Sequence, residues 1–195
     1  SDVYKRQTVN GKPVTDVTAA CGMVFQQYAL FPWRTVQENV EFGLKMRGLS
    51  RAERAPIARK YIEMVGLKQA ADKYPHALSG GMKQRVSIAR VLANDPDVML
   101  FDEPFAALDA MTRQVLQEQL LSIYEQSGKT IAFITHSIDE ALTLSTRMAV
   151  MGSKPGRIVQ DIQNDLPHPR SADVQLSPRF VELKRAIWEL SLIHI

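Results

Sequence analysis

The sequence predicts an α/β protein with a mainly parallel sheet flanked by helices, and one central stretch carries that prediction. Val98 to Phe101 is a short, wholly apolar run between two prolines, which is typical of a strand buried on both faces. Ser79-Gly80-Gly81 open a helical run ahead of it, and the unpaired N–H groups of such a helix start favour an anion. Asp102 and Glu103 stand at the carboxyl end of the strand, where open α/β sheets bind their ligands.

The first half of the chain predicts a hairpin, a strand and two helices. Asn10-Gly11 between short β-prone pieces predicts the hairpin, and residues 21–26 predict a buried strand that ends in a polar residue. Thr35 is followed three residues later by Glu38, which is the pattern of a capping box at the start of a helix. A second helix is expected over 50–65, where apolar residues recur at helical spacing.

The second half continues the alternation of strands and helices. Helices are expected at 111–125, 138–144 and 177–190, and further strands at 130–135, 148–151 and 155–159. The proline-broken residues 166–170 are expected to form a connector. This order of elements is that of an α/β domain.

Length and composition fit one domain, or one domain with a lobe. The 195 residues are 45% hydrophobic, and no apolar run is long enough to span a bilayer. The net charge of +3 does not indicate a protein that binds nucleic acid. The single cysteine, Cys21, excludes an internal disulfide, and no cluster of Cys and His predicts a metal site. Residues 1–7 and 191–195 look like translated sequencing-adapter read-through, which leaves 8–190 as the predicted domain.

The motifs on these elements resemble those of ATP-binding-cassette (ABC) ATPases, from Val9 to Leu190. LSGGMKQR resembles the signature motif of that family, and VMLFDEP resembles its Walker B strand with the following glutamate. VFQ, FAALD and THxxxEA resemble its Q-loop, D-loop and H-loop. The segments FPWRTVQENVEFGL, KYPHALSGGMKQRVSIAR, DEPFAALDAMTR and PGRI…DLPHPR are most similar to the ATPase subunits of nitrate, sulfonate and taurine importers. One departure is Ser137, where the family very often has aspartate.

The resemblance implies a P-loop NTPase-type sheet with a small α-helical subdomain. It divides the chain into a Q-loop and helical subdomain (27–93), a core with the Walker B, D-loop and H-loop motifs (94–162), and a C-terminal connector and helix (163–190). The phosphate-binding loop of the family, G-x-x-x-x-G-K-[ST], does not occur in the 195 residues and would fall before Ser1. We therefore expect an incomplete domain, truncated at its N-terminus, that exposes apolar sheet surface and by itself neither binds nor hydrolyses ATP.

The resemblance also implies a role for each motif residue in the hydrolysis of ATP with Mg²⁺. The catalytic residues would be Glu103, which handles the attacking water, together with His136 and Gln26. The metal would be held by Asp102, and by Gln26 through water. A second set would face ATP bound to a partner subunit: Ser79, Gly80, Gly81, Gln84 and Asp109.

The assembly implied by the resemblance is an importer. Two copies of the ATPase subunit would pair and would contact transmembrane permease subunits through Tyr28 to Arg34. A periplasmic or extracellular solute-binding protein would deliver a small anionic or sulfonate-type solute, which the motifs do not identify further. The subunit would lie peripherally on the cytoplasmic face of the bacterial inner membrane and bind no nucleic acid.

Two alternatives come from other classes of protein. A soluble ABC ATPase of DNA repair or translation would need a long coiled-coil insertion or a second cassette. The compact spacing from Gln26 to Ser79 leaves no room for the insertion. A truncated, non-catalytic binding or regulatory module is the other alternative, and the coding sequence upstream of Thr8 discriminates it from the enzyme.

Overall fold

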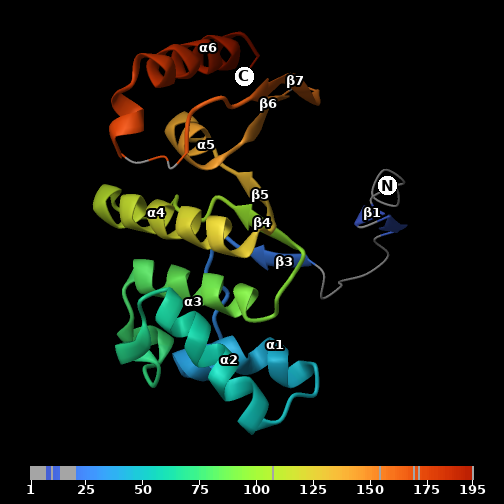
Figure 1. The fold of residues 1–195 in the computed structure, drawn as a ribbon, viewed down its shortest axis with the longest axis vertical. Coiled ribbons are helices and arrows are strands. Elements are labelled where there is room, and N and C mark those ends of the chain that lie inside the picture. Colours follow the sequence, from blue (N-terminus) through green and yellow to red (C-terminus); the bar gives the residue numbers. More distant parts are fainter. Residues whose placement is uncertain are drawn as a thin grey trace. The chain divides into compact units, whose positions relative to one another are not determined.

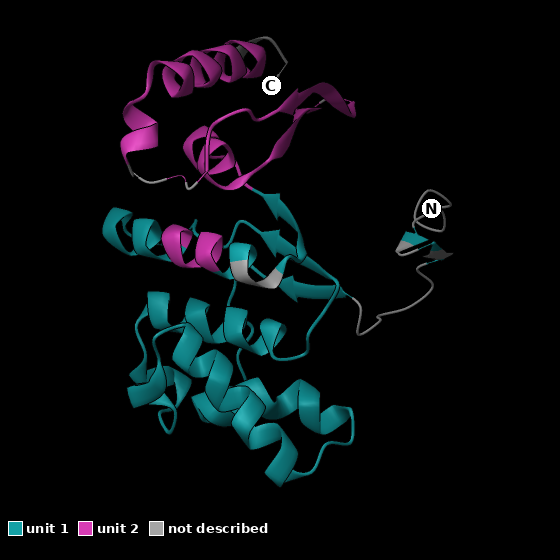
Figure 2. Ribbon diagram, in the orientation of Figure 1, with its two compact units in different colours: residues 1–116, 123–134 teal, residues 117–122, 135–195 magenta. Residues whose placement is uncertain are grey.

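The computed structural model describes residues 8–9, 11–13, 21–106, 108–153, 155–168, 170 and 172–194. The chain divides into two compact units, which Figure 2 shows in different colours. The first unit comprises Ser1–Leu116 with Ile123–Ile134, and the second comprises Gln117–Ser122 with Thr135–Ile195. The predicted division at 27–93, 94–162 and 163–190 stays a prediction.

A parallel sheet of three strands forms the centre of the first unit. Its strands are β3 (Cys21–Val24), β4 (Val98–Asp102) and β5 (Thr130–Ile134), in the order β3-β4-β5 (Figure 1). Phe101 of β4 is paired with Val24 on one side and with Phe133 on the other. The parallel sheet predicted from the apolar runs is thus confirmed. A parallel sheet needs crossover connections, and the helices supply them.

Only one face of this sheet is buried among the described residues, so the prediction of strands buried on both faces was wrong. On the covered face, Met99 and Phe101 are fully buried. Leu100, which points to the opposite face because side chains alternate along a strand, is 36% exposed. On β5, Ile134 is 61% exposed. The exposure of apolar sheet surface was itself expected, and it is confirmed.

Three helices pack together beside the sheet. They are α1 (Val36–Met46), α2 (Arg51–Met64) and α3 (Gly80–Leu92), with short 3-10 turns at Lys68–Ala70 and Pro75–Ala77 between the last two. The three helices contact one another in pairs. Buried aliphatic side chains fill the space between them: Val36, Val40, Leu44, Ala58, Ile62, Val86 and Ala89.

The starts of α1 and α2 are capping boxes, as a serine or threonine followed three residues later by glutamate predicts. At α1, the N–H of Glu38 donates to Thr35 Oγ1 (3.2 Å) and the N–H of Thr35 donates to a carboxylate oxygen of Glu38 (2.9 Å). Ser50 and Glu53 make the same arrangement at α2. These bonds satisfy N–H groups that a helix start otherwise leaves unpaired.

Helix α3 packs closely against strand β3. The approach takes place at Gly22, where a Cβ atom would lie 2.3 Å from Cγ1 of Val91. Glycine is required there because any side chain would push the helix away from the sheet. Helix α4 (Ala110–Ser127) follows β4 and ends at Gly128, whose positive φ of 61° is the usual glycine stop of a helix.

The second unit is built on a two-stranded antiparallel sheet and two helices. Helix α5 (Ile138–Leu144) precedes strands β6 (Arg147–Ser153) and β7 (Gly156–Gln163), and helix α6 (Pro178–His194) closes the unit after a 3-10 turn at Ala172–Leu176. Its core comprises Leu142, Met148, Leu166, Phe180, Leu183 and Ile187. The expected hairpin is a separate pair of short strands, β1 (Thr8–Val9) and β2 (Lys12–Pro13).

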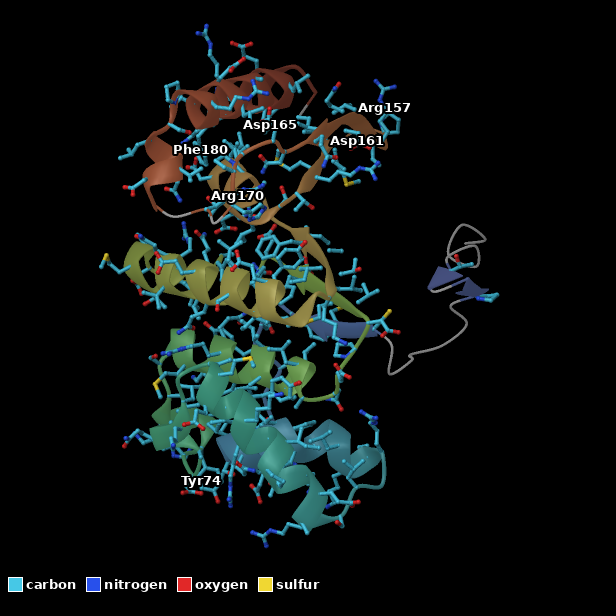
Figure 3. All side chains as sticks on the ribbon, in the orientation of Figure 1. Tyr74, Arg157, Asp161, Asp165, Arg170 and Phe180 are labelled. Carbon is cyan, nitrogen blue, oxygen red and sulfur yellow. The ribbon has the colours of Figure 1, made fainter. Side chains whose placement is uncertain are left out.

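Arg170, labelled in Figure 3 with Phe180, organises the connector that precedes α6. Its buried guanidinium donates to the carbonyl oxygens of Leu142, Thr143 and Ser145 at the end of α5. Carbonyl oxygens at a helix end carry partial negative charge and attract a cation. The proline-broken connector is therefore held in place by one charged side chain. Residues 191–194, expected to lie outside the domain, continue α6, whereas residues 1–7 are outside the described residues.

No helix of the described residues is both long enough and apolar enough to cross a membrane.

Candidate functional site

Three oxygen-bearing side chains follow the ends of two neighbouring strands. Gln26 comes two residues after β3, Asp102 is the last residue of β4, and Glu103 is next to it. Because β3 and β4 are parallel, with Val24 opposite Phe101, all three residues lie at the same carboxyl edge of the sheet. The topology therefore brings together Gln26, Asp102 and Glu103 as the sequence predicts, at the edge where sheets of this type bind ligands.

The backbone of Glu103 has an uncommon conformation. Its φ is +43°, in the left-handed region that residues other than glycine, asparagine and aspartate seldom occupy. A hydrogen bond from its N–H to the carbonyl oxygen of Ile134 (3.0 Å) ties this residue to the end of β5. Strained residues of this kind gather at active sites, where surrounding contacts impose the strain to aim a side chain.

The donor set at this edge fits a magnesium ion that substrate phosphates would complete. Among the described residues, no three His, Cys, Asp or Glu side chains gather as a metal site. Mg²⁺ in nucleotide enzymes is held by one or two protein oxygens together with waters and phosphate oxygens. The carboxylate of Asp102 and the amide oxygen of Gln26 supply donors of that kind.

The glycine-led start of α3 is the second part of the site. Ser79 is the N-cap of the helix, and its Oγ accepts the N–H of Met82 (3.3 Å). At each of the next two residues, a side chain from another element lies close to where a Cβ atom would be. A Cβ at Gly80 would lie 2.9 Å from Oη of Tyr28, and one at Gly81 would lie 2.4 Å from Cγ2 of Thr112. Ser79 itself is exposed, so the positive end of the helix dipole is accessible from solvent.

Gln84 lies one turn further along α3 and is fully buried. Within the described part of the chain, both polar atoms of its amide lack a hydrogen-bond partner, as does Oγ of the buried Ser87. Unpaired buried polar groups are uncommon and costly. The contact predicted between Gln84 and the ATP of a partner subunit would require this side chain to become exposed.

Asp109 is the exposed N-cap of α4. Its carboxylate accepts the N–H of Thr112 (3.0 Å), and this bond holds the pKa of Asp109 below its ordinary value. An ionised carboxylate at a helix start is favoured by the dipole of that helix. Whether Asp109 also contacts a partner subunit stays a prediction.

His136 belongs to the second unit, in the turn between β5 and α5, and its side chain is exposed. The turn is shaped by its neighbours. Thr135 Oγ1 donates to the buried carboxylate of Glu140 (2.6 Å) and accepts the N–H of Ser137 (3.0 Å). Ser137 is the N-cap of α5, and its Oγ accepts the N–H of Glu140. Aspartate is an equally good N-cap, so serine can replace it at this position without loss of the turn.

The segment Tyr28 to Arg34 is held by two side chains that the sequence analysis missed. The amide of the fully buried Asn39 donates to the carbonyl oxygens of Phe31 (3.2 Å), Arg34 (3.1 Å) and Thr35 (2.9 Å), and accepts the N–H of Phe31 (2.9 Å). An asparagine on the apolar face of a predicted helix is the signal that could have found it, since buried amides need partners.

Arg90 is the other missed residue. Its guanidinium donates to the carbonyl oxygen of Ala29 (2.7 Å), and burial lowers its pKa. The sequence offers no local signal for this contact, because Arg90 and Ala29 lie 61 positions apart. In the same segment, the indole of Trp33 is 70% exposed.

Comparisons with known proteins identify the family. The sequence profile described as "ABC transporter" matches residues 2–106. A putative ATP-binding protein of Brucella abortus is 51% identical over 180 residues, which cover 92% of this chain and 69% of that protein. The chain belongs to the ABC transporter family. Its enzymatic class is therefore that of the ABC-type ATPases, as the motifs predict.

Several relatives in this family are import subunits by name. The taurine import ATP-binding protein of Rhizobium johnstonii is 45% identical, over 93% of this chain and 71% of that protein. The nitrate import ATP-binding protein of a Synechocystis strain is 49% identical, over 82% and 60%. The aliphatic sulfonates import ATP-binding protein of Bacillus cereus is 44% identical, over 92% and 69%.

Solved structures of ABC cassettes share the fold. An ATP-binding cassette determined as a dimer in a post-hydrolysis state with ADP and Pi matches with a TM-score of 0.68 and 32% identity, over 80% of this chain and 71% of that chain. A component of an ABC transporter complex from Clostridium perfringens matches with a TM-score of 0.73 and 29% identity, over 91% and 75%.

Proposed function

We propose that this ABC ATPase is the ATP-hydrolysing subunit of an importer for a small anionic or sulfonate-type solute. The observation that carries the enzymatic part is the shared carboxyl edge at which the sheet places Gln26, Asp102 and the strained Glu103. The class of solute is supported by the taurine, nitrate and sulfonate import proteins among the relatives.

In the proposed mechanism, the side chains at the edge of the sheet position water for attack on the γ-phosphate. Glu103 orients the water and accepts its proton. The backbone conformation of Glu103 holds this residue at the sheet edge, where the water would lie. Asp102 would hold Mg²⁺, with Gln26 acting through water, and the ion when bound neutralises charge on the phosphates. His136 would donate a hydrogen bond to the γ-phosphate. Positioning and charge stabilisation supply most of the rate enhancement in such a site.

The glycine-led start of α3 would serve ATP held by a second copy of the subunit. Ser79, Gly80 and Gly81 offer a hydroxyl and unpaired N–H groups at the positive end of a helix, which suits a phosphate. Gln84 and Asp109 are the remaining residues proposed for that contact. The dimeric cassette among the solved relatives supports pairing of two subunits.

The partly exposed segment Tyr28 to Arg34 would contact the permease. Trp33 presents a large amphipathic ring, the kind of side chain that anchors protein interfaces. We place the subunit peripherally at the cytoplasmic face of the bacterial inner membrane, where the transmembrane subunits would receive a solute from a periplasmic or extracellular binding protein.

The experiment compares ATP hydrolysis by two forms of the protein. The 195-residue chain carries no G-x-x-x-x-G-K-[ST], so we expect it to show neither ATP binding nor Mg²⁺-dependent hydrolysis. The same chain joined to an upstream coding sequence that supplies this loop is expected to hydrolyse ATP. In that longer form, Glu103→Gln should abolish turnover and accumulate an ATP-bound dimer on size-exclusion chromatography.

Glu189→Gln is the matched control, because Glu189 is an exposed carboxylate on α6 that accepts a hydrogen bond from Arg185 one turn away. It should leave turnover unchanged. Unchanged turnover in Glu103→Gln would remove Glu103 from the catalytic role. Hydrolysis by the 195-residue chain alone would contradict its expected inactivity, and no hydrolysis by the longer form would favour a non-catalytic module.

A further inference from the structure

We propose that a cavity at the amino edge of the parallel sheet binds a small organic anion with an apolar tail, such as an alkyl sulfonate. The cavity has a volume of about 330 Å³, which is within the range of small-molecule sites. The residues that line it belong to the first unit. Asp95 and Pro96 reach it from just ahead of β4, and Lys129 from just ahead of β5. The proposed ATP site lies at the carboxyl edge of the same strands, so this inference does not rest on it.

One part of the cavity wall is apolar. It is formed by Met64 of α2, Leu92 at the end of α3, Pro96, and Ile123 of α4. Leu92 and Ile123 are buried, so they offer a fixed surface to a ligand. An alkyl tail that covers this wall leaves water, which is favourable.

Helix α2 also supplies a cation to the cavity. Lys60 lies one turn before Met64, so the two side chains share a face of the helix. The ammonium nitrogen of Lys60 lies 5.4 Å from the ring centroid of Tyr61, which also lines the cavity. Within the part of the chain that the structure describes, Lys60 makes no ion pair with a carboxylate. Its charge is therefore available to the head group of a ligand.

The second cation at the cavity, Lys129, is paired with Asp95 (2.8 Å). The hydrogen bond from Lys129 holds the pKa of Asp95 below its ordinary value, and the charges of Arg47 and Lys60 act in the same direction. Asp97 acts on Lys129 as a second negative charge. Three cations thus face two carboxylates, and the net positive charge that remains favours an anion.

This combination of wall and charge selects one class of ligand. A cation would meet the ammonium of Lys60, and a neutral molecule would leave that charge unused. An inorganic anion would leave the apolar wall in water. An anionic head on Lys60 with a tail over Met64 and Leu92 uses both parts of the cavity.

The test follows the methyl group of Met64 in the 195-residue chain, labelled with ¹³C at its methionine methyl groups. The Met64 signal, one of 8, is identified by its loss in Met64→Leu. We expect 1-hexanesulfonate to shift this signal in a saturable way. Methanesulfonate has the charge without the tail, and 1-hexanol has the tail without the charge, so each should bind at least about tenfold more weakly. Met151, exposed on β6 of the second unit, reports non-specific contact and should not shift.

Three variants at exposed positions isolate the charges. Lys60→Gln should weaken the binding of hexanesulfonate by about tenfold or more. Lys68→Gln is the matched control, because Lys68 is a nearby exposed lysine that pairs with Glu63 (2.7 Å) and does not line the cavity. It should leave the affinity unchanged. Asp95→Asn releases Lys129 for a second contact with the head group, so it should tighten binding several-fold. Asparagine tolerates the φ of +52° at this position, and circular dichroism should show the same helix content in all three variants.

Any of four outcomes would overturn the inference. The first is no saturable shift of the Met64 signal with hexanesulfonate. The second is equal affinity for hexanol or for methanesulfonate, which would leave an apolar cavity or an unspecific anion site. The third is an equal loss of affinity in Lys60→Gln and Lys68→Gln, and the fourth is weaker binding in Asp95→Asn. None of these measurements involves ATP, so they are distinguishable from a failure of the proposed function.

Discussion

At the scale of single residues, Glu103 shows how the site acquires its geometry. The residue directly after β4 turns into the left-handed region, with φ of +43°, and its N–H bonds to Ile134 of the neighbouring strand. That backbone hydrogen bond does not depend on the side chain at position 103, because any residue except proline could donate it. The choice of glutamate over glycine at a strained position therefore indicates a need for its side chain.

We predict that Glu103→Gly will be more stable than Glu103→Ala. Both variants lose the carboxylate and keep the backbone N–H, but only glycine adopts this φ without steric strain. The expected difference in the free energy of unfolding is about 1 kcal/mol in favour of glycine. Urea denaturation of the two variants measures it, and equal midpoints would show that position 103 is not strained.

Gln84 is a residue that local sequence reasoning placed on an accessible surface and the structure encloses. Helix α3, which carries Gln84, is contacted by α1, α2 and β3. A motif on a helix indicates which residues share a face, but it does not indicate how many other elements cover that face.

At the scale of elements, the starts of helices were predictable and the anchors between elements were not. A capping box joins residues three positions apart, so the sequence alone predicts the pairing of Thr35 with Glu38. Asn39 bonds to the turn just before its own helix, five and eight positions away, whereas Arg90 bonds to a loop 61 positions away that only the packing of α3 brings within reach. Their importance follows from burial, which a single sequence does not show.

The contact of α3 with β3 yields a second prediction. We expect Gly22→Ala to lower the free energy of unfolding by about 1–3 kcal/mol, because its Cβ would collide with Val91 at 2.3 Å. Adding Val91→Ala removes the colliding methyl group, so the double variant should lose less than the sum of the two single variants.

Gly156→Ala is the control for this experiment, since nothing lies within 4 Å of a Cβ at that position. It should change the free energy of unfolding by less than about 0.5 kcal/mol. Additive effects of Gly22→Ala and Val91→Ala would show that the two residues are not in contact. Thermal or urea unfolding followed by circular dichroism provides the measurement.

At the scale of the whole molecule, the sheet of the first unit has one covered and one open face among the described residues. Met23, Leu100 and Ile134 expose apolar side chains on the open face. Exposed apolar surface of this kind marks a contact surface or a site of aggregation. We therefore expect the 195-residue chain to aggregate and to bind hydrophobic dyes.

Ile134→Thr tests the role of this face. Threonine keeps the β-branched shape that suits a strand but adds a hydroxyl to an exposed position. We predict less light scattering on concentration and weaker dye fluorescence, with a change in unfolding free energy below about 0.5 kcal/mol.

Met99→Thr makes a comparable change on the buried face, where the side chain is fully enclosed. It should destabilise the chain by about 2 kcal/mol or more, because it removes apolar contacts and buries a hydroxyl. If Ile134→Thr proves as destabilising as Met99→Thr, the open face is covered in solution.

The sequence by itself determined the class of fold, the helix starts and the motif residues of an ABC ATPase. The fold class follows from the spacing of apolar residues, and the helix starts follow from interactions between residues a few positions apart. The motif residues follow from short motifs and their order in the sequence. Only the tertiary structure decided which face of the sheet is buried, that Gln84 is enclosed, and that Asn39 and Arg90 hold the segment bearing Trp33. The physical reason is that burial and long-range hydrogen bonds depend on which elements pack together, and that information is distributed over the whole chain.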